Sequence, residues 1–270
     1  GNNKWNVDPF GGEVSDGKIW GRGSSDMKGG VAAMIMAAID ASKNGAPEGG
    51  VRLIFTAAEE LGCIGIQQLM KTIDNKGSAS AIIVGEPTGN IPATGHKGAI
   101  YLNAVTTGKT AHSSMPHLGD NAIYKAAESI LKAKEFQFET EEDPLLGFPT
   151  INVGKMSGGL NLNSVPDHAE FTIDIRSTSK TDHPMTISRL AEELGNETSL
   201  EVLVDMTPVF TPEDDPFVRM VYEICGIDKN MAGFPKSLPY LTDGSVLQKT
   251  YGGVPTIILG PGEAEMAHKT

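Results

Sequence analysis

Residues 18–40 read KIWGRGSSDMKGGVAAMIMAAID, and this stretch sets the fold that we expect for the whole chain. A short strand at 18–21 runs into a glycine-bearing turn that carries Asp26. Apolar side chains then recur at three- and four-residue spacing through 27–41, which predicts a helix. A strand, an acidic turn and a helix in this order are typical of an open α/β sheet, which binds ligands where its strands end.

The same arrangement repeats outward along the chain. Apolar strands are predicted at 51–56 and 80–85, with a helix at 64–73 between them. Strands that are apolar throughout and separated by helices indicate a mostly parallel sheet that is covered on both faces. The pattern resumes late in the chain, where it predicts helices at 216–225 and 244–251 and a strand at 255–259.

The middle of the chain has a different pattern. Its elements are predicted in the order strand, helix, strand, strand, helix, strand, at 98–107, 121–136, 149–156, 168–177, 186–194 and 200–209. This β-α-β-β-α-β order is that of a split βαβ sandwich, so we expect an α+β domain at 94–208, inserted into a discontinuous first domain of 1–93 and 209–270. His96 and Lys97 are expected in a solvated hinge where the insertion begins.

Composition restricts the class of protein. The 270 residues are 39% hydrophobic, enough for two domains, and carry a net charge of −12 with a pI near 4.9. Such a chain repels phosphates, which argues against nucleic acid and anionic membranes as partners, and its apolar runs fall far below the ~20 residues of a membrane span. Cys63 and Cys225 lie far apart in the sequence, which favours a reducing, cytoplasmic compartment over a disulfide framework.

Four turns at predicted strand ends carry acidic or imidazole side chains. They hold Asp26, the pair Glu59 and Glu60, Glu86, and His268. Such donors suit Zn²⁺, Mn²⁺ or Co²⁺, and a bridging carboxylate, for which Asp26 is the candidate, holds two ions ~3.5–4 Å apart in hydrolytic sites. Glu60 can then bind metal while Glu59 takes a proton from a metal-bound water, whose pKa zinc lowers to ~7.

Each of these side chains also has a simpler interpretation when it is taken alone. Asp26 can cap the helix that follows it, and Glu59 and Glu60 can be solvated acids in the first turn of a helix. His268 can be a surface residue. The joint occurrence of four such turns at sheet edges favours a site.

Seven motifs occur in a fixed order along nearly the whole chain. They are GRGSSDMKGG (21–30), AAEELGCIG (57–65), GEPTG (85–89), GKTAHSSMPHLGDNAI (108–123), NLNSVPD (161–167), TIDIRS (172–177) and GVPTIILGPGEAEMAH (253–268). In this order they resemble the co-catalytic zinc amidohydrolases of the acetylornithine deacetylase, succinyl-diaminopimelate desuccinylase and carboxypeptidase G type. The resemblance implies an α/β catalytic domain with a mixed, mostly parallel sheet covered by helices, and an inserted lid and dimerisation domain.

The resemblance also implies a role for each matching residue of the catalytic domain. Asp26 matches the ligand that bridges two zinc ions, Glu86 a ligand of one ion, and Glu60 and His268 ligands of the other. Glu59 matches the general base. A cis peptide bond between Asp26 and Met27 is implied as well.

Three residues of the lid domain match functional positions of the family. His112 resembles a histidine that reaches the active site of the partner subunit and stabilises the oxyanion, so the resemblance implies a homodimer formed through the lid. Asn163 and Arg176 match positions that look suited to hold the substrate carboxylate. Two other interpretations stay open: His112 can stabilise the turn before Pro116, and Arg176 can pair with a neighbouring acid.

The chain departs from the family in one respect. The family has a His-x-Asp pair ahead of the bridging Asp, and this pair, which supplies a further zinc ligand, is absent here. One metal site therefore keeps Asp26, Glu60 and His268, whereas the other keeps only Asp26 and Glu86. We expect the chain to be an internal piece of a longer protein, truncated at both ends.

Together these observations predict a metal-dependent hydrolase that cleaves the amide bond of an N-acyl amino acid. It would hold two divalent ions, Zn or else Co or Mn, and Glu59 would activate a metal-bound water. Two alternatives remain. One is a metallo-dipeptidase or carboxypeptidase of the same family, and the other is a non-catalytic scaffold that binds acyl amino acids or dimerises, because a zinc ligand is missing.

Overall fold

The computed structural model describes residues 5–45, 48–227 and 237–267. The chain divides into two compact units: unit 1 comprises Gly1–His96 and Val209–Thr270, and unit 2 comprises Lys97–Pro208. Unit 2 thus begins at Lys97, three residues after the start that was predicted for the insertion at residue 94. Among the described residues, no helix combines the length and the apolar character needed to cross a lipid bilayer.

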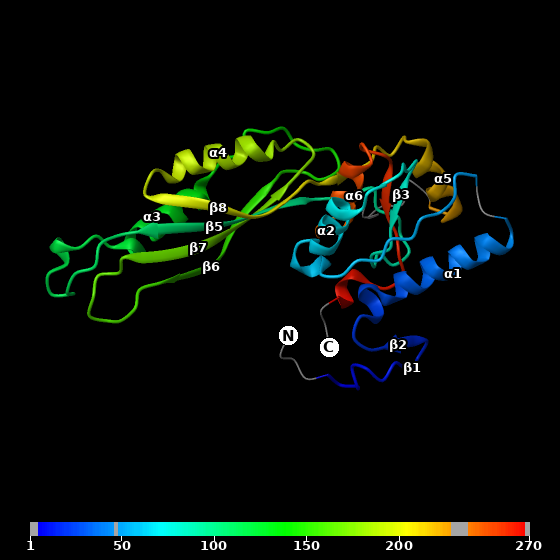
Figure 1. Cartoon of the computed structure of the whole chain (residues 1–270), viewed down its shortest axis with the longest axis horizontal. Helices are drawn as coiled ribbons and strands as arrows, with labels where there is room; N and C mark the ends of the chain where they lie inside the picture. The colour runs from blue at the N-terminus through cyan, green and yellow to red at the C-terminus, as the bar shows by residue number, and fades with distance from the viewer. Residues whose placement is uncertain (1–4, 46–47, 228–236, 268–270) are drawn as a thin grey trace. The chain divides into compact units, whose positions relative to one another are not determined.

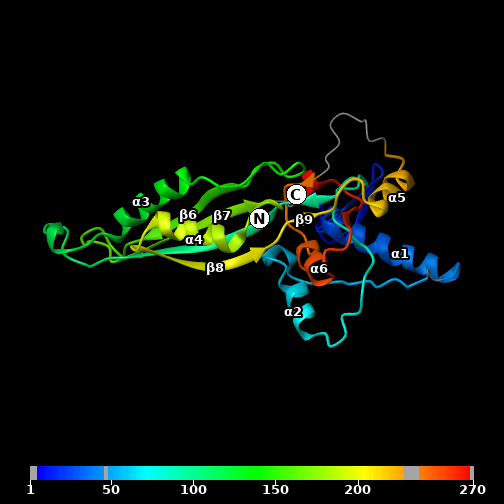
Figure 2. The same cartoon turned by 90° about the horizontal axis from the view of Figure 1, so that it is seen from above.

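Unit 2 is built on a four-stranded antiparallel sheet with the strand order β6-β7-β5-β8. The strands are β5 (Gly98–Thr107), β6 (Thr150–Gly158), β7 (His168–Ser177) and β8 (Thr198–Met206). Helices α3 (Ala122–Glu135) and α4 (His183–Leu194) lie on one face of this sheet (Figures 1 and 2). The chain order β5-α3-β6-β7-α4-β8 is the predicted split βαβ sandwich.

Alternation along the strands builds the core of unit 2. Every second residue of β7, including Phe171, Ile173 and Ile175, is buried against α3 and α4, while the residues between them lie on the uncovered face of the sheet. From α4, Leu190 and Leu194 enter the same core at four-residue spacing. One cluster of apolar side chains therefore joins the sheet to both helices.

Local capping determines where the two helices of unit 2 begin. The Asn121 side chain accepts hydrogen bonds from the backbone N–H groups of Ile123 and Tyr124, so α3 starts where it was predicted. Asp182 caps α4 by accepting from Met185 N. Because of this cap and a proline in its first turn, α4 begins at His183, ahead of the start predicted at residue 186.

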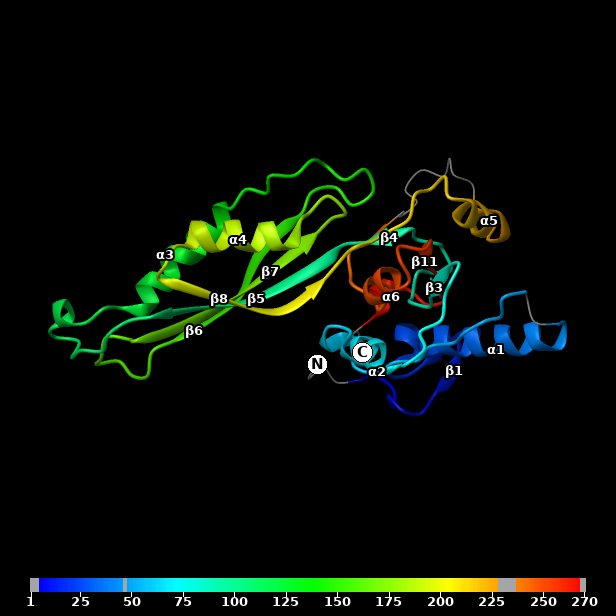
Figure 3. The same cartoon turned by 45° about the horizontal axis from the view of Figure 1, so that its top comes forward.

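Unit 1 contains several short sheets. In Figure 3, β3 (Ile82–Val84) and β11 (Thr256–Ile258) run side by side, and they pair in parallel. β4 (Gly95–His96) pairs in parallel with β10 (Ser237–Leu238) and antiparallel with β9 (Val209–Phe210). A hairpin joins β1 (Glu13–Ser15) to β2 (Lys18–Trp20). This mixed α/β arrangement agrees with the predicted fold class.

The helices of unit 1 are α1 (Gly29–Lys43), α2 (Ile64–Thr72), α5 (Pro216–Ile224) and α6 (Gly244–Thr250). Short helical turns complete the described elements: η1 (Ser24–Lys28), η2 (Glu59–Leu61) and η4 (Ala264–Met266) in unit 1, and η3 (Pro116–Leu118) in unit 2. Strand β11 is buried on both faces, since Ile257 packs in the cluster formed with α5 and Ile258 in the cluster formed with β3 and β9. Its apolar sequence predicted this burial.

Three further details of the sequence prediction are wrong. Residues 51–56 form no strand, because a strand requires a hydrogen-bonded neighbour and no described residues provide one. Strand β8 ends at Met206 instead of continuing to Val209, because Pro208 has no N–H to donate to a ladder. His96 is fully buried in β4, and not in a solvated hinge, with its Nε2 3.0 Å from Thr242 Oγ1.

The core of unit 2 yields a stability prediction. Phe171 is 1% exposed, so Phe171→Ala should lower the free energy of unfolding by about 3–5 kcal/mol, through lost burial and the cavity left behind. Tyr124 on α3 is 71% exposed, and Tyr124→Ala should change the free energy of unfolding by no more than about 0.5 kcal/mol. Urea unfolding followed by circular dichroism measures both. Equal effects of the two substitutions would contradict the described core.

Candidate active site

Two turns and the start of a helix come together at one edge of unit 1. Strand β3 leads into Gly85 and Glu86, and α1 packs so closely on this turn that a Cβ at Gly30 would lie 2.0 Å from Gly85 O. Only glycine allows this approach. The turn after β11 lies against the same segment, with Thr88 N donating to Gly260 O at 3.1 Å. Asp26 and Glu86 are thereby brought to the same edge.

Asp26 lies in the irregular turn η1 that precedes α1. Its backbone is non-helical, with φ −119° and ψ 99°, and the peptide bond from Asp26 to Met27 is cis, as the resemblance implied. The N-cap residue of α1 is Lys28, and no side chain caps this helix. The simpler interpretation of Asp26, as a helix cap, therefore does not describe the structure.

Glu59 and Glu60 form the short turn η2 between residues of left-handed conformation. Glu59 is partly buried and Glu60 is exposed, so the two neighbours have different surroundings. The Glu59 Oε1 atom lies 3.8 Å from the Sγ of Cys63, a buried and free thiol. The different surroundings fit two different tasks for the pair.

Asp243 is an acidic residue of this region that the sequence analysis missed. It precedes α6, and its Oδ2 accepts a hydrogen bond from Thr56 Oγ1 at 2.5 Å. Its charge acts on both Glu59 and Glu86. The only sequence signal is an acid just before a predicted helix, which is the signal of an ordinary N-cap. Nothing in the local sequence marks it as part of a cluster.

The carboxyl groups form one electrostatic cluster. Burial and, to a smaller extent, the charges of Glu59, Asp26, Asp243 and Glu60 together raise the pKa of Glu86 to about 8. The pKa of Glu59 is raised to about 7, first by burial and then by the charges of Asp243, Glu60 and Asp26. Repulsion among neighbouring carboxylates favours either protonation of one of them or the binding of a cation between them.

The donor chemistry of the cluster fits divalent metal ions. Carboxylate oxygens are ligands for Zn²⁺, Mn²⁺ and Co²⁺, and a positive ion relieves the repulsion that raises these pKa values. Within the described residues, no three His, Cys, Asp or Glu side chains are arranged to ligate one ion. His268, the predicted imidazole ligand, lies outside the described residues.

Arg176, the residue predicted to hold a substrate carboxylate, is paired with an acid of its own strand. Its Nη2 donates to Asp174 Oδ2 at 3.0 Å, and its Nε lies 2.9 Å from Asp174 Oδ1. The guanidinium also lies over the ring of Tyr101, at 5.3 Å from the ring centre. The alternative interpretation, pairing with a neighbouring acid, therefore describes its contacts in this structure.

His112 and Asn163 lie together in unit 2. Ser113 N donates to Asn163 O at 3.0 Å, and the exposed His112 accepts from Ser114 N at its Nδ1 at 3.2 Å, a contact that stabilises the local turn. Asn163 lies five residues before His168, the first residue of β7, and Arg176 lies eight residues further along the strand, a rise of roughly 26 Å at 3.3 Å per residue. Within one chain, Asn163 and Arg176 therefore lie toward opposite ends of β7.

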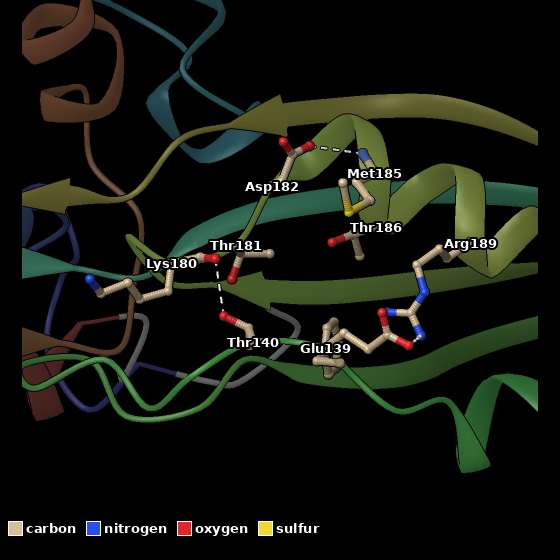
Figure 4. Close-up of a pocket in the computed structure, with 9 residues that line it drawn as sticks. Glu139, Thr140, Lys180, Thr181, Asp182, Met185, Thr186 and Arg189 are labelled. Carbon is tan, nitrogen blue, oxygen red and sulfur yellow. Dashed lines mark hydrogen bonds and ion pairs between the residues drawn. The ribbon is translucent and has the colours of Figure 1, made fainter.

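A separate polar pocket lies in unit 2 beside the start of α4 (Figure 4). Arg189 pairs with Glu139 there at 2.9 Å, and Thr140 donates to the backbone oxygen of Lys180 at 3.0 Å. None of the predicted site residues lines it. With its charged guanidinium already paired, this pocket offers no further evidence of a ligand.

An α/β unit with a carboxylate cluster and an inserted α+β unit make up the protein, and comparison with known proteins identifies its family. The model of peptidase family M20/M25/M40 matches residues 1–270, so the chain belongs to this family. It is 30% identical over 297 residues to a probable succinyl-diaminopimelate desuccinylase of Staphylococcus epidermidis, covering 98% of this chain and 73% of that protein. The resemblance drawn from the seven motifs is thereby confirmed.

Solved structures confirm the fold. Aminopeptidase PepT from Bacillus cereus is similar with a TM-score of 0.68 at 24% identity, over 92% of this chain and 67% of that one. An M20 family metallo-carboxypeptidase, Sso-CP2 from Sulfolobus solfataricus, has a TM-score of 0.68 at 20% identity, over 96% of this chain and 76% of that one. At these identities the likeness concerns the fold alone.

The cluster predicts how the stability of the metal-free protein depends on pH. The pKa of Glu86 is about 8 in the folded state against 4.5 for an ordinary Glu, so between these values the folded state holds a proton that the unfolded state has lost. Stability should therefore fall as the pH rises from about 5 through about 8, and Glu86→Gln should flatten this fall. The urea midpoint of metal-free protein at several pH values measures it.

Glu141→Gln is the matched control, because Glu141 is an exposed Glu whose loss removes the same charge elsewhere. This variant should keep the pH dependence of the natural sequence. An unchanged slope in Glu86→Gln would contradict the raised pKa of Glu86.

Proposed function

We propose that the protein is a metal-dependent amidohydrolase that removes the acyl group from an N-acyl amino acid, in the manner of an acetylornithine deacetylase or a succinyl-diaminopimelate desuccinylase. The observation that carries the proposal is the carboxylate cluster, in which Glu59 has a pKa of about 7. The 30% identity to a probable succinyl-diaminopimelate desuccinylase supports the substrate class. The two free cysteines support a reducing compartment such as the cytoplasm.

Asp26, Glu60, Glu86 and His268 would hold two divalent cations, Zn or else Co or Mn, with Asp26 shared between them. When bound, such ions act as Lewis acids on a water molecule and on the carbonyl oxygen of the substrate. The raised pKa of Glu86 supports this assignment, because a carboxylate surrounded by like charges gains most from a cation.

Glu59 is the general base of the proposed reaction. Its carboxylate takes a proton from the attacking water and returns it to the amine that leaves, so that the amide bond breaks to an acid and an amine. A base works best when its pKa lies near the working pH, and the pKa of Glu59 at about 7 meets this condition. Burial and the neighbouring carboxylates cause this value.

Unit 2 would supply the remaining groups. Arg176 and Asn163 are proposed to hold the substrate carboxylate, and His112 to stabilise the oxyanion in the active site of a second copy of the chain. The separation of His112 and Asn163 from Arg176 along β7 supports a homodimer, in which different subunits contribute these groups to one site.

The first test substitutes the base. Glu59→Gln should lower kcat on the order of 10³-fold with its metal content unchanged, because only proton transfer is lost. Glu60→Gln should instead lose metal. Hydrolysis of N-succinyl and N-acetyl amino acids, with dipeptides in parallel, and metal analysis measure the effects.

Removal of metal by a chelator should abolish the activity, and added Zn or Co should restore it. Preference for dipeptides would favour the metallo-dipeptidase alternative. Metal-loaded protein that cleaves none of these substrates would favour the non-catalytic scaffold.

A second test addresses the homodimer. Glu59→Gln and His112→Ala should each be nearly inactive, yet mixing them should restore about a quarter of the activity, since half of the dimers formed contain one intact site. Unfolding and refolding the two proteins together allows the subunits to exchange. No recovery from a mixture that contains heterodimers would contradict the role given to His112.

A further inference from the structure

We propose that Cys63 and Asp243 are positioning residues that hold the carboxyl group of Glu59 in place for proton transfer. The inference rests on the proposed function, in which Glu59 is the base. It assigns a positioning task to Cys63, which takes no part in the mechanism above, and to Asp243, which entered that mechanism only through its charge.

The turn after Glu59 brings the Cys63 thiol back to the Glu59 side chain. Gly62 N and Cys63 N both donate to Glu59 O, at 2.9 and 2.8 Å, and Cys63 has the left-handed φ of 57°. As a result the Sγ of Cys63 lies 3.8 Å from Glu59 Oε1. A thiol is a weak hydrogen-bond donor, so this contact can tether one carboxylate oxygen and leave Oε2 to accept a proton.

The thiol is kept as a donor by its surroundings. Cys63 is fully buried, and burial raises its pKa, as do the charges of Glu59 and Asp243. The S–H group interacts with both of these carboxyl groups. The neutral Cys63 thiol therefore lies near two carboxylates, those of Glu59 and Asp243, which repel each other.

Asp243, the second carboxyl group near the thiol, is fixed by a hydrogen bond of its own. Thr56 Oγ1 donates to its Oδ2 at 2.5 Å, and the preceding residue, Thr242, is fully buried and accepts from Gly244 N at 3.0 Å. The Asp243 Oδ1 atom is also buried, and no described residue offers it a well-aligned donor. Its charge is thus not dispersed by a second strong hydrogen bond.

The two groups act on Glu59 in opposite ways. The charge of Asp243 repels the ionised Glu59 carboxylate, while the Cys63 thiol contacts its Oε1 at 3.8 Å. With both in place the side chain has a narrow range of positions, which suits a base that must meet a water molecule at hydrogen-bond distance. Loss of either one should widen that range.

Three substitutions in the metal-loaded full chain test the inference. Cys63→Ala removes the tether and should lower kcat about tenfold to a hundredfold, with KM and metal content unchanged. Cys63→Ser keeps a donor and should retain most of the activity. Asp243→Asn keeps the shape but not the charge, and should lower kcat without changing KM. Cys225→Ala, at the other free cysteine, should change nothing.

A purely structural role would give a different result. Cys63→Ser would then lose as much as Cys63→Ala, and both losses would follow a lower melting temperature or lower metal content. Either that pattern, or full activity in Cys63→Ala and Asp243→Asn, would overturn the inference.

The S–H stretching band in the infrared spectrum tests the contact without turnover. Cys225→Ala leaves Cys63 as the only source of this band, and on that background Glu59→Gln should move it to higher frequency because a neutral acceptor binds the S–H proton less strongly. A band that does not move would overturn the inference even in an active enzyme. An inactive natural sequence with a moving band would count against the proposed function, and not against the contact.

Discussion

Repulsion among gathered carboxylates is the constraint on which unit 1 depends. The charges of Asp26, Glu60 and Asp243 act on both Glu59 and Glu86, and this repulsion, added to burial, raises the pKa of the two Glu side chains. The backbone keeps them together through contacts that tolerate no side chain: a Cβ at Gly260 would lie 2.4 Å from Gly85 O, as one at Gly30 would lie 2.0 Å from the same atom. Close packing of the backbone at Gly30, Gly85 and Gly260 thus keeps the carboxylates together although their charges repel one another.

Most of unit 2 could be predicted because its structure is determined locally. A sheet covered on one face alternates buried and exposed residues, so β5 and β7 were predicted with the bounds that the structure has. The start of α4 was missed because Asp182 and the proline after it lie ahead of the first apolar residue of the repeating pattern. In unit 1, α2, α5 and α6 were predicted to within a residue at their ends.

What could not be predicted depends on distant residues. Residues 51–56 have the composition of a strand, but composition cannot supply a neighbour to pair with. Asp26, Glu59, Glu60 and Glu86 were singled out because each follows a strand-like run, and they share one electrostatic cluster. Asp243 was not, because only the fold brings α6 beside Thr56. Arg176 and Asp174 are alternate residues of one strand and so point to the same face. The sequence therefore allowed both a pair with Asp174 and a role in substrate binding for Arg176.

The chain passes between the two units twice, and the position of these two connections has a consequence for the evolution of the protein. Unit 2 departs after β4 and the chain returns at β9, and these strands pair with each other, Gly95 opposite Phe210. The two ends of the insertion are thus neighbours, and the insertion has a hydrophobic core of its own. Unit 2 is therefore an insertion joined to unit 1 at one place, the pair of strands β4 and β9. The helices and outer strands of unit 2 can therefore change in evolution while unit 1 keeps its strand pairing and its carboxylate cluster.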